Sequence, residues 1–412
     1  MSTFNNLETV VKEVATKIDA EMPIVSAVMQ DMSNEYTNTS GETIYMSLPD
    51  YGAGATSGVD ATSTTGAVHL EKIPVTISCK HDAVNLNILE SAFKAGNAKT
   101  QIMEPRIQHL GSDIEADLLN TIFLGAGSAE IKESGTGDYK DLRKVAARVY
   151  KSRLRGEVYA AMDFSLGAEV KDSGVAYFQA SSLDKTFGTR AYGDVEGVKI
   201  IGTQDISNLI TGNHTLGSGT TMKVKTEVNT DGASSIVLKV AGGTATLTGA
   251  IKKGEIIFLK DATSGAYVNG TNVYRQSNGV KFPFIAQADA TASGNELTVT
   301  VQKLYFTATD ARKNVDVTTL PVDMVAEFGH TASSVYKKCA LWAKPSVLFV
   351  NRPLPDIESC KNMNVSTLGG VKFLQSTGGS VDTANNKTVW RFMTGSTYYY
   401  NSGIAVYYVK QS

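Results

Sequence analysis

The segment that most constrains the fold is a long polar insertion between two strand-like stretches near the N-terminus. Apolar and polar residues alternate at 44–48 and again at 73–77, a pattern typical of half-buried strands. The segment between them, 50–67, consists almost entirely of Gly, Ala, Ser, Thr and Asp. A hairpin turn needs only about two to five residues. The sequence therefore predicts a two-stranded arm whose tip is too small and polar to form a core of its own.

Apolar residues at helical spacing predict three helices in the N-terminal part of the chain. The first occupies 7–18 and ends near Pro23. The second is the longest; it begins near Pro105, where a missing N–H costs least, and stops at Gly125. The third covers 138–154 and carries on one face the apolar residues Leu142, Val145, Ala146 and Val149.

The segment 221–325 has a different texture from the rest of the chain. Short alternating runs follow one another there, separated by Gly, Asn or Asp. Turn signals at intervals of roughly eight to twelve residues are typical of an all-β domain. This segment is therefore expected to form a small antiparallel barrel or sandwich.

The flanking segments mix helical and strand-like patterns. A strand is expected at 158–162 and a helix at 165–178, followed by an apolar piece at 196–207. Helical and mixed character returns in 331–355, and the stretch 387–411 is again strand-like. The whole chain is therefore expected to be an α+β protein that an all-β insertion interrupts.

No catalytic constellation is recognisable in the sequence. Neither a Gly-x-Ser-x-Gly nor a Walker motif occurs, and the Gly-rich stretch at Gly52 lacks dinucleotide-binding spacing. The five histidines are never within five residues of one another, so a metal cluster is not expected. Asp113, Glu115 and Asp117 are expected on a solvated or salt-bridging helix face. We therefore expect no enzyme activity, no catalytic residue, no bound metal and no cofactor.

The charged residues contain one basic cluster, although the net charge of the chain is only −2. Asp141 is the single acid within it, and Tyr150 alone interleaves with the cations, too little for base stacking. The cluster either faces an acidic partner, nucleic acid or a neighbouring subunit, or is a solvated face paired within the molecule. It consists of Lys140, Arg143, Lys144, Arg148, Lys151, Arg153 and Arg155.

The sequence contains no targeting or membrane signal that we recognise. The N-terminus lacks a basic region followed by an apolar one, and no run of about eighteen apolar residues occurs. Cys79, Cys339 and Cys360 are odd in number and form no Cys-x-x-Cys pair, which favours free thiols in a reducing compartment. We therefore expect neither secretion by a signal peptide nor a membrane partner.

Five tyrosines stand near the C-terminus, at 398–400 and at 407 and 408. They could form a binding surface. Aromatic side chains are common in buried strands, however, so positions in the core are favoured.

Six stretches stand in an order that resembles a known family. They are "NNLETVVKEVATKIDAEMPIV" followed by "ETIYMSLP", then "IQHLGSDIEADLLNTIFLGAG", "GDVEGVKIIGTQDISNLITG", "KKGEIIFLKDA" and "YYYNSGIAVYYV". In that order they are similar to the N-terminal arm and extended loop, the spine helix, the segment before an insertion, a strand of the insertion and the last strands of tailed-phage major capsid proteins. The closest resemblance is to the coat proteins of short-tailed Salmonella-type phages, which carry an inserted β-domain.

The resemblance implies a Hong Kong 97-like phage capsid fold of the α+β class. Its parts would be a long spine helix, an extended β-hairpin arm (the E-loop) and an inserted small antiparallel β-barrel or sandwich. The implied divisions are an N-terminal arm and helix at 1–35, the extended loop at 36–80, the capsid core at 81–220 and 326–412, and the inserted domain at 221–325.

The resemblance also implies a function. The chain would be a major capsid protein that self-assembles through hexamer and pentamer contacts into an icosahedral shell around double-stranded DNA. It would reside in the virion capsid, be assembled in the host cytoplasm, and have scaffolding and portal proteins and non-specifically bound DNA as further partners.

Two alternatives remain open from the sequence. The basic cluster either faces packaged DNA or meets acidic positions of a neighbour's arm, such as Asp50 and Asp60, and the near-zero net charge favours the second. The alternative function is a β-rich binding or adhesion module that recognises carbohydrate or a surface partner.

Overall fold

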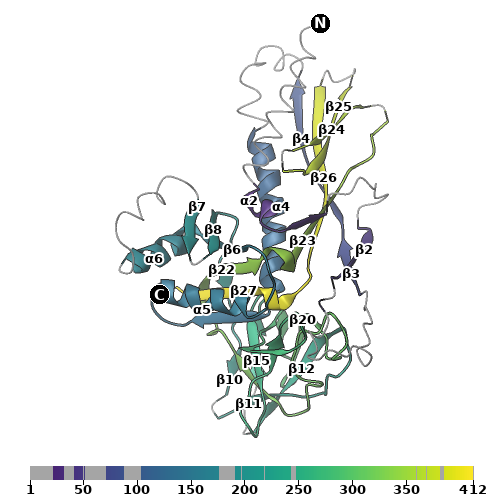
Figure 1. Cartoon of the computed structure of the whole chain (residues 1–412). Coiled ribbons are helices and arrows are strands. Elements are labelled where there is room, and N and C mark those ends of the chain that lie inside the picture. Colours follow the sequence, from purple (N-terminus) through teal and green to yellow (C-terminus); the bar gives the residue numbers. More distant parts are fainter. Residues whose placement is uncertain are drawn as a thin grey trace, which may run out of the picture. The chain divides into compact units, whose positions relative to one another are not determined.

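The structure of the chain is a computed structural model, and its mixture of helices and strands makes it α+β (Figure 1). The first expected helix, at 7–18, and residues Asp50 and Asp60 lie outside the described residues. The described residues are 22–31, 41–49, 51, 71–87, 104–175, 191–195, 197–217, 219–242, 247–358, 360–367, 369–380 and 385–411.

The chain divides into two compact units, which are described one at a time. The first unit consists of Met1–Met46, Pro74–Leu119 and Leu348–Thr397, and the second of Ser47–Ile73, Asn120–Val347 and Tyr398–Ser412.

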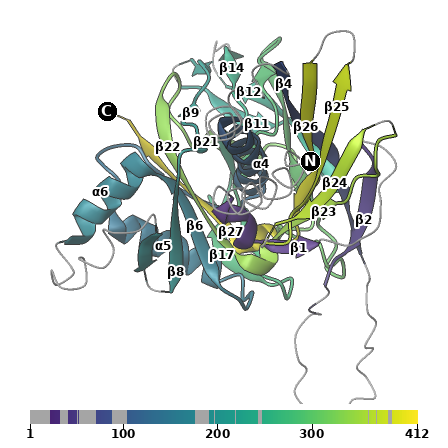
Figure 2. The ribbon, with the colours of Figure 1, turned by 90° about the horizontal axis from the view of Figure 1, so that it is seen from above.

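The first unit contains a six-stranded sheet built around the long strand β26 (Figure 2). β26 pairs antiparallel with both β25 and β4, and β1 lies parallel to β23. Trp390 of β26 is buried and donates a 2.9 Å hydrogen bond to Gln375 Oε1. The strands are β1 (Met29–Asp31), β4 (Ser78–Asn87), β23 (Val347–Arg352), β24 (Lys361–Ser366), β25 (Lys372–Ser380) and β26 (Asn385–Tyr398).

The longest helix, α4 (Glu104–Leu124), begins and ends where the sequence predicted. Glu115, which the sequence assigned to a solvated face, is instead 1% exposed. Its carboxylate accepts a 2.6 Å hydrogen bond from the N–H of Ile24, in the short helix α2 (Pro23–Ser26). That prediction was wrong because the carboxylate satisfies a helix-terminal N–H far away in the sequence. The apolar stripe is buried at Leu110, Ile114, Leu118 and Ile122.

The second unit contains a seven-stranded sheet of mixed direction. Its strands follow the order β5, β27, β22, β6, β8 and β7, and β9 pairs with β22. β5 and β27 run parallel, as do β6 and β8. The strands are β5 (Ser128–Lys132), β6 (Val158–Asp163), β7 (Ala191–Val195), β8 (Val198–Thr203), β9 (Leu209–Ile210), β22 (Val335–Ala343) and β27 (Ile404–Lys410).

The segment 331–355 was expected to have helical and mixed character, but strands β22 and β23 make up most of it and its helical part is a single 3-10 turn, Lys344–Ser346. β22 lies between β27 and β6, and Cys339, Leu341 and Trp342 are each fully buried. A central strand covered on both faces has a continuous apolar run, which periodicity does not separate from a buried helix. The prediction for the C-terminal tyrosines is confirmed for four of the five, since Tyr399, Tyr400, Tyr407 and Tyr408 are at most 6% exposed, whereas Tyr398 is partly buried.

Helices α5 (Tyr139–Tyr150) and α6 (Phe164–Val175) pack against this sheet (Figure 2). The Asp138 side chain accepts the Lys140 N–H at 3.0 Å and caps α5. The predicted apolar face of α5 is confirmed as buried. The helix is shorter than the expected 138–154, because Arg153 adopts a left-handed backbone with φ of 61°.

The strands between residues 215 and 328, termed the β segment, include a six-stranded sheet in the order β18, β15, β21, β11, β12 and β20. Its buried apolar residues, from Met222 to Ala326, form one cluster drawn from the segment itself. Its sheet strands are β11 (Thr221–Val224), β12 (Ala233–Ala241), β15 (Ile256–Lys260), β18 (Phe284–Ile285), β20 (Glu296–Leu304) and β21 (Val325–Phe328).

Three short strand pairs complete the β segment. They are β10 (Thr215–Leu216) with β13 (Leu247–Thr248), β14 (Ala250–Ile251) with β19 (Ala290–Thr291), and β16 (Asn269–Thr271) with β17 (Ser277–Lys281).

The arm predicted from the sequence is present as a two-stranded ribbon of β2 (Thr43–Ser47) and β3 (Lys72–Thr76). Beyond the strands, Leu48 N–H donates to Glu71 O at 2.9 Å. Burial alternates along both strands, and no described strand outside the ribbon pairs with either. The tip, 52–70, lies outside the described residues.

Candidate functional site: the basic helix, an adjoining cavity and the arm

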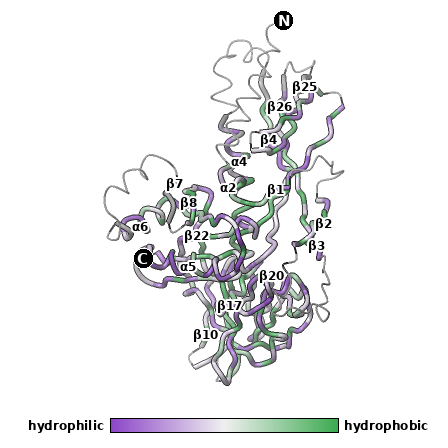
Figure 3. The backbone as a smooth tube through the Cα atoms, in the orientation of Figure 1, coloured by the Kyte–Doolittle hydropathy of each residue, from purple (hydrophilic) through white to green (hydrophobic). Residues whose placement is uncertain are grey.

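The basic cluster lies on α5 and the turn after it, where hydrophilic colours dominate the helix in Figure 3. The apolar face of α5 contacts β27 and β5, and the basic residues of the helix other than Arg148 are exposed. Arg148 is only partly exposed, whereas the other six basic residues are exposed: Lys140, Arg143, Lys144, Lys151, Arg153 and Arg155.

Part of this basic cluster is neutralised within the molecule. Lys144 Nζ lies 2.8 Å from Asp141 Oδ1, and Lys132 Nζ lies 3.2 Å from Asp141 Oδ2. Partial burial acts to raise the pKa of Asp141, but the hydrogen bonds from Lys144 and Lys132 outweigh it and hold that pKa below its usual range. Arg148 pairs with Glu130 and also donates to the Ala129 carbonyl. The fully solvated surface is therefore smaller than the sequence suggested.

The residues after the helix extend the positive surface. Arg153 places its guanidinium 5.9 Å from the centroid of the Tyr274 ring, a distance at which a cation–π attraction operates. Leu154, between two exposed arginines, is buried and anchors this turn. Lys151, Arg153 and Arg155 thus project from a backbone that is held in place.

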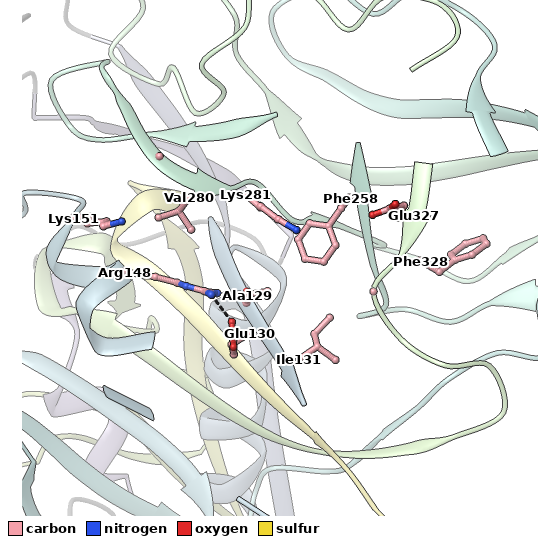
Figure 4. A pocket seen from close by; sticks show the side chains of 12 residues that line it. Ala129, Glu130, Ile131, Arg148, Lys151, Phe258, Val280, Lys281, Glu327 and Phe328 are labelled. Atoms are coloured by element: carbon pink, nitrogen blue, oxygen red, sulfur yellow. Dashed lines mark hydrogen bonds and ion pairs between the residues drawn. The ribbon is translucent and has the colours of Figure 1, made fainter. Parts of the chain in front are cut away.

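A cavity of about 560 Å³ adjoins α5 within the second unit (Figure 4). β5 and α5 form one wall, and β15, β17 and β21 of the β segment form the other. Sequence reasoning did not find the second wall, because its residues are far from α5 in the chain and belong to no motif. The lining side chains that bear charge or an aromatic ring are Glu130, Arg148, Lys151, Phe258, Lys281, Glu327 and Phe328.

The charges on the β-segment wall are largely compensated there. Glu327 pairs with Lys260 and accepts a 2.6 Å hydrogen bond from the Tyr267 hydroxyl. Burial acts to raise the pKa of Glu327, but these two partners outweigh it and lower that pKa. Lys281 Nζ lies 3.4 Å from the centroid of the Tyr267 ring. Both acids among the described lining residues, Glu130 and Glu327, are therefore paired with a cation.

No catalytic or metal site emerges from the described part of the chain. Within the described ranges, no three His, Cys, Asp or Glu side chains are grouped to hold a metal ion. His81 and His109 are exposed, whereas His214 and His330, distant in sequence, are both buried near Glu255. None of the helices searched among the described residues is long and apolar enough to cross a membrane.

The residues between the arm strands and the arm tip contact other parts of the second unit. The Tyr400 hydroxyl donates to the Pro49 carbonyl, and the Tyr51 and Tyr400 rings lie 5.6 Å apart. Arg312 also reaches Glu71 at 3.1 Å. Along the ribbon itself Tyr45 is 65% exposed. The two acids proposed as arm contacts, Asp50 and Asp60, lie outside the residues that the structure describes.

Comparison with known proteins gives no sequence relative. No protein-family model matches the chain, and no curated protein matches it. Among solved structures it is similar to the capsid of Ralstonia phage GP4, with 5% identity, a TM-score of 0.45 and coverage of 93% of this chain and 87% of that one.

Two further solved structures are similar at the same level. The acid-stable capsid of Helicobacter pylori bacteriophage KHP30 has 7% identity and a TM-score of 0.43, over 95% of this chain and 91% of that one. A virus-like particle from Pyrococcus furiosus has 7% identity and a TM-score of 0.39, over 97% and 98%. Identities and TM-scores this low assign no family, so the functional proposal rests on the residues of the chain itself.

Proposed function

We propose that the chain is the major capsid protein of a tailed bacteriophage, of the Hong Kong 97-like fold. Its copies associate as hexamers and pentamers into an icosahedral shell that encloses double-stranded DNA. The observation that carries the proposal is the β2–β3 ribbon, which exposes Tyr45 and pairs with no other described strand.

The ribbon needs a partner for its stability. An isolated two-stranded hairpin is marginally stable in water, because it buries little apolar surface. Here the residues from Thr43 to Ser47 alternate between exposed and half-buried, so neither face of β2 is fully covered. A second copy of the chain is the partner that a self-assembling shell supplies at every position. Many repeated modest contacts then add up to a stable particle.

The remaining parts of the chain have roles in this proposal. Helix α4 is the rigid spine, the β segment is an inserted domain at about 221–325, and the flanking segments are the capsid core. The exposed cations Lys151, Arg153 and Arg155 contact a neighbouring subunit, with packaged DNA as the second candidate. Scaffolding and portal proteins act during assembly in the host cytoplasm. No step of this function requires a catalytic residue, a metal or a cofactor.

The alternative, a carbohydrate-binding or adhesion module, has no comparable support. A carbohydrate reader in the β segment would present exposed aromatic rings. Among the described residues the large exposed hydrophobic side chains are Tyr45, Tyr51, Tyr150, Ile210 and Val322. Only Val322 belongs to the β segment, and it is not aromatic.

Electron microscopy of the purified full-length chain tests the proposal. Samples at high concentration, with and without polyethylene glycol as a crowding agent, are expected to contain closed shells or curved sheets tens of nanometres across. Monomers or dimers under all conditions, together with binding in a glycan screen, would contradict the capsid function and support the alternative.

A further inference from the structure

Two chain crossings that run side by side join the β segment to the seven-stranded sheet. The first follows β9 and covers 211–214, and the second covers 329–331 before β22. Thr211 N–H donates to Ser334 O at 2.9 Å, and Ser333 N–H donates to Gly212 O at 2.8 Å. One small junction, defined as 211–214 with 329–334, therefore holds both ends of the β segment.

Each crossing carries one buried histidine. His214 is 8% exposed and His330 is 3% exposed. The centroids of the His214 and Phe328 rings lie 4.0 Å apart. The His330 ring makes edge-to-face contacts with the rings of Tyr336 and Tyr408, each with a centroid distance of 4.7 Å. His214 Nδ1 and His330 Nε2 are buried without a hydrogen-bond partner among the described residues. Burial without such partners disfavours a charged imidazole. This holds most strongly for His330, because Glu255 lies within ion-pair distance of His214.

The geometry around His330 also requires its neutral form. The Ile256 N–H donates to His330 Nδ1 at 3.3 Å, so this nitrogen must keep a free lone pair. In imidazolium both ring nitrogens are donors, and the N–H of Ile256 would then point at another N–H. Burial, with a smaller contribution from His214, lowers the pKa of His330 to about 3. Burial also lowers the pKa of His214.

Glu255 is the acidic group that faces the junction. Its Oε1 accepts the N–H groups of Gly212 and Lys252, each at 2.6 Å, and its Oε2 lies 3.5 Å from His214 Nδ1. Burial raises the pKa of Glu255, although its two backbone hydrogen bonds oppose the shift. On acidification this carboxyl therefore takes up a proton within the closed junction and offsets part of the effect of the histidines.

Further ionisable groups face the junction from the neighbouring elements. On the Glu255 side, Lys252 pairs with Asp289 at 2.7 Å. On the His330 side, the Tyr336 hydroxyl donates to Glu133, and Lys410 lies 3.7 Å from the same carboxylate. In each pair the carboxylate is already bound by its own partner, so neither carboxylate is available as an anion for His330.

Backbone packing prevents the junction from shifting to accommodate a charge. A Cβ at Gly212 would lie 1.9 Å from Ala250 O. A Cβ at Gly249, which has φ of +89°, would lie 2.3 Å from Asn213 O. Because backbone meets backbone at both positions, a buried imidazolium reaches water only when the crossings separate from the β segment.

We propose that this junction is an acid-sensitive latch, in which protonation of His330 and His214 opens the contact while the β segment keeps its own core. The latch goes beyond the assembly function and operates in a single copy of the chain.

The direction of the pH dependence follows from the two states. A histidine in the open junction has a pKa near 6.5, whereas His330 in the closed junction has a pKa of about 3. Above pH 6.5 neither state binds the proton and the closed state is fully favoured. Below it the open state binds protons first, so opening becomes up to tenfold more favourable for each pH unit. From pH 7 to pH 5 His330 alone contributes about a 25-fold increase.

Hydrogen exchange of the full-length chain at pH 7, 6 and 5, corrected for intrinsic rates with unstructured reference peptides, tests the latch. Protection in peptides covering 208–216 and 325–334 is expected to fall about 25-fold from pH 7 to pH 5. Peptides from β20 and β27 are expected to retain their protection. His330→Asn keeps an acceptor oxygen near the position of Nδ1 but does not titrate, so its junction is expected to lose most of the pH dependence. The exposed His109→Asn variant should behave as the unmodified chain.

Three results would overturn the latch. They are constant protection in the unmodified chain, an equal fall in His330→Asn, and an equal fall in β27, which would indicate general acid unfolding. If His330→Asn does not fold, Glu255→Gln replaces it as the deciding variant. Without the opposing carboxyl its junction should open more steeply with falling pH, and an unchanged slope would contradict the proposal.

Discussion

The β segment and the arm are both made of β-strands, yet they bury their side chains in opposite ways. In the β segment, residues such as Val224, Leu238, Phe284 and Val299 are 0% exposed and contact one another across its strands. In the arm, β2 has no fully buried residue, and Tyr45 is 65% exposed. Alternating sequences thus produced one region with its own core and another without.

The difference teaches which region is stable in a single copy of the chain. Burial of apolar surface is the main favourable term in folding, so the β segment contributes its own stability. The arm depends on its attachment at Tyr400 and Arg312 and, in the proposed shell, on a neighbouring copy. Four predictions test this contrast.

The largest effect is expected in the core of the β segment. Phe284→Ala removes a fully buried ring that packs edge-on to Phe282, with centroids 5.2 Å apart. It should lower the free energy of unfolding by about 3–5 kcal/mol in urea denaturation. The matched arm variant Ile44→Ala, at a half-buried position, should cost about 1 kcal/mol in the unassembled chain. Equal costs would remove the contrast between the two regions.

The next effect concerns the attachment of the β segment. Gly212→Ala introduces a methyl group against the backbone carbonyl of Ala250 and should cost about 3 kcal/mol, read from thermal and urea unfolding. Gly265→Ala is the control, because its Cβ meets nothing within 4 Å and only the positive φ is strained. That control should cost about 1 kcal/mol. A cost for Gly212→Ala no larger than that of the control would show that the crossing is not rigidly packed.

A smaller effect is expected where the arm is attached. Tyr400→Phe removes the hydroxyl that donates to the Pro49 carbonyl and keeps the ring contact with Tyr51. Because one hydrogen bond is lost, the free energy of unfolding should fall by about 0.5–1.5 kcal/mol in urea. No change at all would indicate that the arm is not held through this hydroxyl.

The smallest effect on a single chain is expected at the exposed face of the arm. Tyr45→Asp should change the free energy of unfolding by less than about 0.5 kcal/mol, since the side chain is already solvated. In sedimentation of assembled material the same variant should yield few or no particles. Val322→Asp, at an exposed position of the β segment, serves as the charge-matched control and should still assemble. Normal assembly of Tyr45→Asp would show that the exposed face of the arm does not take part in assembly.

Sequence periodicity predicted the elements whose burial is one-sided. Helices α4 and α5 were found from their apolar stripes, because each has one face toward a core. The arm strands were found from their alternating apolar and polar residues. β22 was missed because both of its faces are covered in the middle of the sheet. The assignment of these segments to the parts of a Hong Kong 97-like fold stays a prediction.

The site was less predictable than the fold. The basic cluster was visible as a run of cations, but its partial neutralisation by Glu130 required knowledge of the pairing between β5 and β27. Lys281 of the cavity and the junction of His214 with His330 depend on which distant segments the topology brings together. No local sequence pattern indicates such contacts between distant segments.

The position of β27 has a consequence for the order of folding during synthesis. β27 lies between β5 and β22, so the seven-stranded sheet cannot be completed until residue 410 has left the ribosome. The β segment has all its strands by residue 328 and can form its core earlier. At a translation rate of about 5–20 residues per second, the interval is on the order of 4–16 s. For those seconds each nascent chain has a finished β segment and an unfinished sheet, and this is when exposed strand edges on neighbouring nascent chains most need to be kept apart.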